Sequence, residues 1–228
     1  MTTRRALAAC SLVLCLAVSV AVSAPARADF GQPLPPDGVV LEDAIAVEIL
    51  DREVVAFDLV GSGRLSTRLQ KGEQVLFRGA RGRVAVVLTT DRILGATPAS
   101  SSWQVENYRV SEHPVAHAEI SQSLAVVLTS QRALALFGTG NWTEESLGPR
   151  ETVVDVTVGP GTAVVITNRR ALGVSAQTGG FFEAKLRLDE QIEAVNAISG
   201  LATVTTSERT LLFKGPSGLW IEHTRPVR

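Results

Sequence analysis

Five polar side chains interrupt apolar stretches and are the first candidates for chemistry: His117, Glu119, Asp155, Thr157 and Asn196. Alternate residues of a β-strand point to the same face of the sheet. If the segments that contain these five residues are innermost strands, the five side chains would line a shared channel. A histidine and carboxylates that converge on a channel can hold a cation or polarise a sugar or a water molecule. The simpler interpretation is a solvated channel. A slip of one residue would also reverse which side chains face inward.

A second set of charged residues recurs at a nearly constant interval. Arginines stand at positions 92, 132, 170 and 209, which are 40, 38 and 39 residues apart, and stepping back 40 residues reaches a more diverged copy at position 52. Glutamates recur before each arginine except the first. The complete set is Arg52, Arg92, Arg132, Arg170, Arg209, Glu73, Glu112, Glu151 and Glu190.

The repeated phrase around each arginine explains why these charges recur. "AVVITNRRALG" from Ala163 has near-copies from Ala85, Ala125 and Ala202, and a threonine precedes the arginine by three residues in each. A buried Glu–Thr–Arg network at one corner of each unit would satisfy its own polar groups. The alternative is a ring of five arginines that captures an anion. The repeated glutamates would neutralise such a ring, so the sequence favours the structural network.

Each unit is predicted to contain four short strands. In the fourth copy they are "VVDVTV" (153–158), "AVVIT" (163–167), "ALGVS" (171–175) and "FFEAKLRL" (181–188), with connectors of two to five residues. Such short connectors make neighbouring strands antiparallel. Four antiparallel strands at a period of about 40 residues are typical of one propeller blade. The sequence therefore predicts an all-β fold, a five-bladed β-propeller of four-stranded antiparallel blades, over residues 38–228. An open arc of blades closed by a second subunit and a paired-sheet sandwich are the alternatives.

Closure of the predicted ring has no obvious strand to support it. The chain enters the first blade near its innermost strand, "GVVLED" (38–43), and ends just after an outermost strand. Residues 29–37 form an N-terminal extension with three prolines, and a proline-rich segment makes a poor strand. Closure would then depend on side-chain packing.

The N-terminus has the pattern of a secretory signal peptide over residues 1–28. Two arginines precede an apolar run from Ala6 to Val22, and Ala26-Arg27-Ala28 supplies a cleavage site. We therefore expect a periplasmic or secreted protein, in contact with a membrane only if the signal is retained as an anchor. Both cysteines, Cys10 and Cys15, lie inside this segment, so the mature chain has no thiol chemistry.

Two units resemble the repeats of quinoprotein-like and other tryptophan-docking propellers. These units are "VVAFDLVGSGRLSTRL" and "RALGVSAQTGGFFEAKL". The second places a glycine two residues before an aromatic, as in Gly179 and Phe181, Gly140 and Trp142, and Gly218 and Trp220, whereas the first has the glycine without the aromatic. The resemblance implies that glycine makes a turn and that the aromatic docks on the next blade. It implies no quinone cofactor, because the dedicated quinone and metal site of such enzymes has no counterpart in this sequence.

Composition and motifs favour binding over catalysis. Removal of residues 1–28 leaves 19 basic and 23 acidic residues, without a basic run, which argues against a nucleic-acid partner. The sequence offers no catalytic motif, no metal-ligand spacing and no cofactor fingerprint. We expect an exported scaffold that binds a protein partner in the cell envelope. The alternatives are a carbohydrate-binding or glycoside-acting propeller that uses channel carboxylates, and a sensor that binds a small ligand or metal in the channel.

Overall fold

The computed structural model describes residues 43–224, apart from the side chains of residues 114–117. The chain divides into two compact units, Met1–Val39 and Val40–Arg228, and the description concerns the second. The predicted signal peptide (1–28) and extension (29–37) lie outside the described residues. So does the predicted first strand (38–43), except for Asp43.

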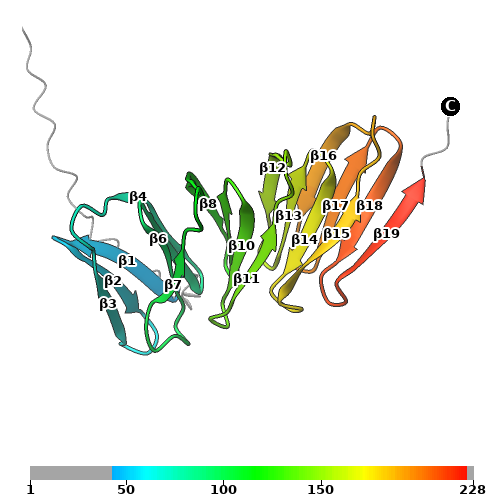
Figure 1. The fold of residues 1–228 in the computed structure, drawn as a ribbon. Coiled ribbons are helices and arrows are strands. Elements are labelled where there is room, and N and C mark those ends of the chain that lie inside the picture. The colour runs from blue at the N-terminus through cyan, green and yellow to red at the C-terminus, as the bar shows by residue number, and fades with distance from the viewer. Residues whose placement is uncertain (1–42, 225–228) are drawn as a thin grey trace, which may run out of the picture. The chain divides into compact units, whose positions relative to one another are not determined.

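The described residues form five antiparallel sheets, numbered blades 1 to 5 in chain order (Figure 1). Blade 1 shows three strands: β1 (Ile45–Leu50), β2 (Glu53–Asp58) and β3 (Arg64–Arg68). Blade 2 has β4 (Val75–Arg81), β5 (Val84–Thr89), β6 (Arg92–Ala96) and β7 (Gln104–Asn107). Blade 3 has β8 (Pro114–Ile120), β9 (Leu124–Thr129), β10 (Arg132–Phe137) and β11 (Trp142–Ser146). Blade 4 has β12 (Val153–Val158), β13 (Thr162–Thr167), β14 (Arg170–Ser175) and β15 (Gly180–Lys185). Blade 5 has β16 (Ile192–Ala197), β17 (Leu201–Thr206), β18 (Arg209–Lys214) and β19 (Leu219–Thr224).

The predicted fold class is confirmed: the protein is an all-β, five-bladed β-propeller of antiparallel blades. Within each blade the strands pair in chain order, from the inner strand to the outer one. Blade 1 shows three strands in the described residues because its predicted inner strand precedes them. Among the described residues no helix is long and apolar enough to cross a membrane.

The hydrophobic core lies between successive blades. The described residues contain four buried clusters, and each one joins a blade to the next in chain order. The central strands β5, β10 and β13 are buried along their whole length, because both of their faces meet a neighbouring blade. Among the described residues, none of the four clusters joins blade 5 to blade 1.

The repeated aromatic residues pack between blades, but on the preceding blade. A Cβ atom at Gly95 of blade 2 would lie 2.6 Å from the ring of Trp142 in blade 3. Trp220 of blade 5 donates from Nε1 to the carbonyl of Phe182 in blade 4, at 2.9 Å. The expected docking on the next blade is therefore wrong in direction. The outer strand follows the other three in the chain, and its aromatic turns back toward the blade already formed.

A bulge near the start of the inner strands changes which residues share a face. The register shifts by one residue between Val153 and Asp155, and equivalent shifts occur in β4 and β16. Because the extra residue reverses the alternation, Val153 packs in the same cluster as Val156 and Val158. Val153 and Asp155 therefore do not share a face, although they lie two residues apart: Asp155 is exposed while Val153 is half-buried.

Candidate functional site

The charged residues of blade 4 meet at the corner where the chain enters the blade. One carboxylate oxygen of Glu151, Oε1, accepts hydrogen bonds from Nε of Arg170 and from Oγ1 of Thr167, both at 2.8 Å. The other oxygen accepts from the backbone N–H of Gly148 at 2.7 Å. Arg170 also donates from Nη2 to the carbonyl of Ser146, at 2.8 Å, where the outer strand of blade 3 ends. The arrangement, called the clasp below, therefore ties each blade to the one before it.

The clasp is built in the same way in blades 2 to 5. Its four triads are Glu73–Thr89–Arg92, Glu112–Thr129–Arg132, Glu151–Thr167–Arg170 and Glu190–Thr206–Arg209. The distance from the arginine Nε to the glutamate Oε1 is 2.9, 2.8, 2.8 and 2.7 Å, in that order. The carbonyls that accept from the arginines belong to Arg68, Asn107, Ser146 and Lys185 of the preceding blades.

Burial and hydrogen bonding act in opposite directions on the clasp glutamates. Their side chains are between 0% and 3% exposed, which by itself would raise their pKa values. Hydrogen bonds from the arginine, a backbone N–H and the threonine outweigh burial, so all four pKa values are lowered. The pKa of Glu190 falls to about 2. The carboxylates are thus ionised at neutral pH, and the arginines that face them are occupied rather than available to a free anion.

Arg52 stands apart from the clasps. Strand pairing aligns Glu53, the first residue of β2, with the arginine that begins the equivalent strand of the other blades, such as Arg170 in β14. Arg52 lies one residue earlier, in an exposed turn, and donates to the carbonyl of Leu69 at 3.2 Å. Its assignment to the repeated network is therefore wrong by one position. The spacing of 40 residues suggested the match, whereas the strand register shows that Glu53 occupies the equivalent position.

Two of the five predicted channel residues come together. Glu119 of β8 and Asp155 of β12 line a cavity of about 290 Å³ at the boundary of blades 3 and 4, whose other walls are valines and a leucine. Thr157 is half-buried and Asn196 is exposed, and neither lines this cavity. His117 lies in β8, but its side chain is not described. Within the described part of the chain, no group of three metal-ligating side chains is close enough to hold an ion.

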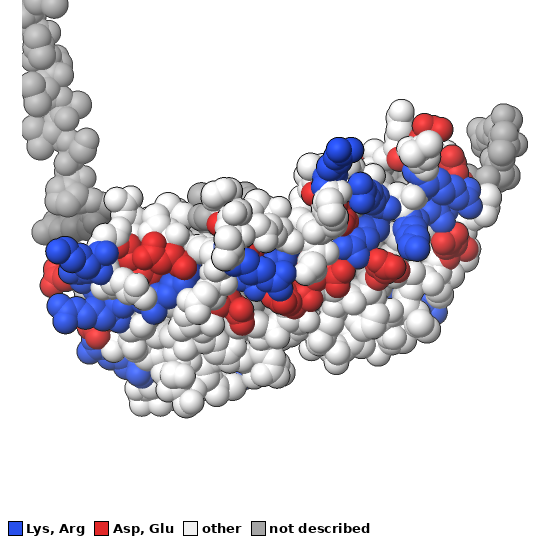
Figure 2. Space-filling model, viewed as in Figure 1, with Lys and Arg blue, Asp and Glu red and all other residues white. Residues whose placement is uncertain are grey.

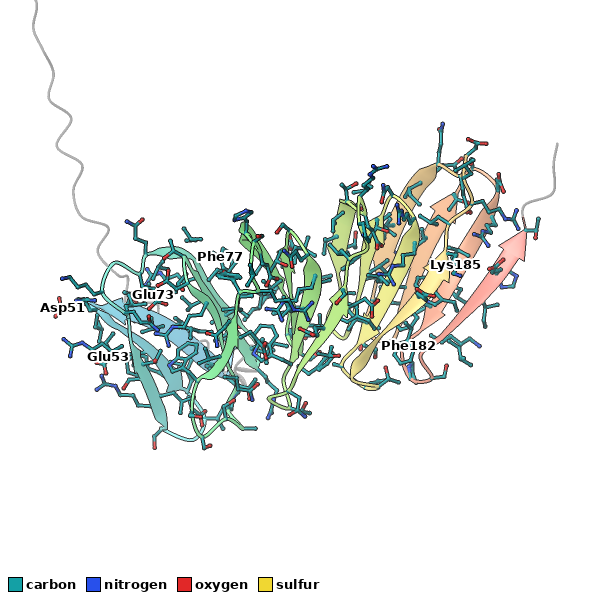
Figure 3. All side chains as sticks on the ribbon, in the orientation of Figure 1. Asp51, Glu53, Glu73, Phe77, Phe182 and Lys185 are labelled. Atoms are coloured by element: carbon teal, nitrogen blue, oxygen red, sulfur yellow. The ribbon has the colours of Figure 1, made fainter. Side chains whose placement is uncertain are left out.

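The two ends of the blades differ in charge. Lys and Arg, together with Asp and Glu, gather in a band across the end that carries the clasps, whereas the opposite end is largely uncharged on the face shown in Figure 2. Figure 3 shows Glu73 and Lys185 toward the charged end and Phe182 toward the other. The charged end, with its turns between one blade and the next, is called the clasp face.

The turns on the clasp face carry a feature that the sequence analysis missed. Two residues before each clasp glutamate, the turn displays one side chain: Lys71, Val110, Pro149 or Leu188. Val110 is 92% exposed and Leu188 is 99% exposed, which is unusual for large apolar residues. Aligning the sequence on its repeated glutamates would have shown this series, but its members differ in type and so form no motif.

Comparisons with known proteins find distant structural similarity alone. No family model matches the chain, and no curated protein matches it. Human WBSCR16 is similar in structure, with a TM-score of 0.39 and 9% identity over 80% of this chain and 65% of that one. Prp20p from Saccharomyces cerevisiae has a TM-score of 0.42 and 8% identity, over 75% and 55%. The WD40 domain of SCAP from fission yeast has a TM-score of 0.38 and 13% identity, over 81% and 54%.

The chain spans 54% to 65% of the length of these three solved chains. At these identities and scores the similarity carries no argument about function, which must come from the surface of this chain.

Proposed function

We propose that the protein is an exported, non-catalytic scaffold that binds a protein partner in the cell envelope through its clasp face. The observation that supports this most directly is the row of apolar turn residues, with Val110 and Leu188 almost fully exposed. Single exposed apolar side chains are ordinary, but here they occupy the same turn position in different blades. Export rests on the predicted signal peptide over residues 1–28.

The clasps suit these turns to binding because they fix the backbone. In blade 3 the backbone N–H of Arg109 donates to Glu112 at 2.6 Å, and the N–H of Glu112 donates back to the carbonyl of Arg109 at 3.0 Å. Blade 5 repeats the pair with Arg187 and Glu190. A turn held in this way loses little conformational entropy when a partner binds, which favours affinity.

The test is crosslinked affinity capture from the native envelope with the exported chain as bait. A Val110→Ser/Leu188→Ser variant should lose the partner that the unmodified protein captures. An Ile198→Ser/Leu219→Ser variant is the matched control, because these side chains are 51% and 60% exposed but lie away from the clasp face. A partner that both variants retain, or that only the control loses, would place the binding surface elsewhere.

A second candidate function is carbohydrate binding or glycoside hydrolysis in the cavity that Glu119 and Asp155 line. The specific observation is that two predicted channel carboxylates share a cavity of about 290 Å³. The aliphatic walls offer no aromatic platform for a sugar ring, which is why this function ranks second. A Glu119→Gln/Asp155→Asn variant should lose any thermal stabilisation by a sugar panel that the unmodified protein shows. A panel that stabilises neither protein removes this candidate.

A further inference from the structure

The clasp face is hollowed where blade 4 follows blade 3. A groove of about 500 Å³ is lined by Arg109, Ser130 and Ser146 of blade 3 and by Pro149 and Arg150 at the entrance to blade 4. Glu151 also contributes to its wall, but both carboxylate oxygens of Glu151 already accept hydrogen bonds in the clasp. The negative charge of Glu151 is therefore already neutralised by Arg170 within the clasp.

The charges beside the groove are where the repeats disagree most. The residue before the clasp glutamate is Arg150 in blade 4, whereas blades 2, 3 and 5 have glycine, serine and aspartate. The residue before the clasp arginine is Arg169 in blade 4, whereas the other three have aspartate, glutamine and glutamate. The two turns touch, because Asn168 donates from Nδ2 to the carbonyl of Arg150 at 3.1 Å. Blade 4 thus concentrates positive charge at a place where blade 5 carries negative charge.

Arg150 occupies a backbone conformation that favours glycine. Its φ is 62°, and the equivalent Gly72 of blade 2 has a φ of 89°. Ser111 of blade 3 has the same conformation, with a φ of 63°, so the turn sets this backbone conformation and the charge of Arg150 is what distinguishes blade 4.

We propose that this groove binds an extended acidic segment of the partner protein, an inference that rests on the proposed scaffold function. Carboxylates of the segment pair with Arg150 and Arg169, since guanidinium groups bind carboxylates through well-directed hydrogen bonds. Apolar residues of the segment contact Pro149 at the rim and the exposed Val110 and Leu188 on the flanking blades. The positive charge of the groove therefore selects an acidic segment, and the exposed apolar turn residues extend the contact of that segment along the clasp face.

The experiment measures fluorescence anisotropy of a labelled peptide in which Asp and Glu alternate with Leu and Val. The full exported chain should bind it more tightly than a matched peptide with Lys in place of each acid. An Arg150→Gly/Arg169→Gln variant should bind at least about tenfold more weakly, and its affinity should depend less on salt. Glycine at position 150 matches blade 2, so this variant should keep its fold, which circular dichroism checks.

An Arg83→Gln/Lys214→Gln variant is the matched control. It removes the same charge from residues at the opposite ends of the strands and should leave peptide affinity unchanged. Equal affinity of the unmodified protein and the Arg150→Gly/Arg169→Gln variant would overturn the proposal. So would a preference for the Lys peptide or for a single-stranded oligonucleotide. If Val110→Ser/Leu188→Ser still loses the native partner in that case, the scaffold function stands and only the acidic segment is wrong.

Discussion

Blade 4 and blade 1 share the same strand pattern but differ at the corner that the clasp occupies. In blade 4 this corner holds Thr167 and Arg170, and Glu151 binds both. In blade 1 the equivalent positions are Leu50 and Glu53. The clasp arginine binds a carbonyl of the preceding blade, and no blade precedes blade 1 in the described chain. The difference indicates that the clasp is a device for joining blades rather than for completing a single sheet.

Equivalent faces of blades 4 and 5 differ in polarity. On the side that faces blade 5, blade 4 carries Val164, Ile166 and Ala171, all buried. The equivalent residues of blade 5 are Thr203, Thr205 and Thr210, all half-exposed. Among the described residues, none of the four buried clusters includes these threonines, whereas their counterparts in blade 4 pack in the cluster shared with blade 5.

The largest expected effect comes from breaking a clasp. In blade 3 the side chain of Arg132 is 4% exposed and that of Glu112 is fully buried. An Arg132→Ala substitution leaves the carboxylate of Glu112 buried without its cation. We expect a loss of about 3–5 kcal/mol in the free energy of unfolding, measured by urea denaturation. A loss below about 1 kcal/mol would show that the clasp does not stabilise the boundary between blades.

The second largest effect is expected from acid, which should lower the free energy of unfolding of the blades that carry a clasp. The pKa of Glu190 is about 2 in the folded protein, below the ordinary value of 4.5, because hydrogen bonds from Arg209, Arg187 N–H and Thr206 overcome the effect of burial. A lowered pKa gives stability that is complete above pH 4.5 and is lost as the pH falls from there toward 2. We expect the Glu190 clasp to lose on the order of 2 kcal/mol over this window, and the other three clasps, whose glutamate pKa values are also lowered, to lose stability in acid in the same direction.

The measurement is the urea midpoint at about pH 7, 5, 3 and 2, which spans the window set by linkage. A Glu190→Gln variant should be less stable at neutral pH and should show a shallower fall with acid, since the amide that replaces the carboxylate takes up no proton. A pH dependence as steep as that of the unmodified protein would assign the acid sensitivity to other groups.

The fold could be predicted from the sequence because its signal is repeated. Strand lengths, short connectors and the period of about 40 residues recur in five copies, so errors in one copy are corrected by the others. The Glu–Thr–Arg contacts followed from the same periodicity, since three recurring polar types at one corner can satisfy each other. This reasoning fails at Arg52, because in the diverged first copy the arginine lies one residue before the position that the clasp arginines occupy.

The facing of inner-strand residues and the exposure of the turn residues could not be predicted from the repeat in the same way. A bulge adds one residue without changing the apolar pattern, so the facing of Asp155 depends on hydrogen-bond register that the sequence does not encode locally. The turn residues Val110, Pro149 and Leu188 share a position but not a residue type. Their role depends on exposure, which only the folded chain reveals.

A smaller effect is expected where the blades pack most tightly. A Cβ atom at Gly173 of blade 4 would lie 2.6 Å from the ring of Phe213 in blade 5, whereas blade 1 has Ala56 at the equivalent position. Gly173→Ala should therefore cost about 1–3 kcal/mol through overpacking. Gly180→Ala is the control, because its Cβ would lie 3.7 Å from Phe182, an ordinary contact. Equal thermal shifts in the two variants would contradict tight packing at Gly173.

The smallest effect is expected at the corner of blade 1, which has no clasp. Arg64 and Glu53 form an ion pair at 3.2 Å, but their side chains are 54% and 42% exposed. Water screens such a pair, so Arg64→Ala should change the free energy of unfolding by less than about 1 kcal/mol in the same urea experiment. Arg64→Ala removes one exposed ion pair, whereas Arg132→Ala removes the buried pair with Glu112, two further pairs with Glu106 and Glu144, and the blade-to-blade bond. If both variants lost the same stability, the distinction between the clasped and unclasped corners would have no energetic basis.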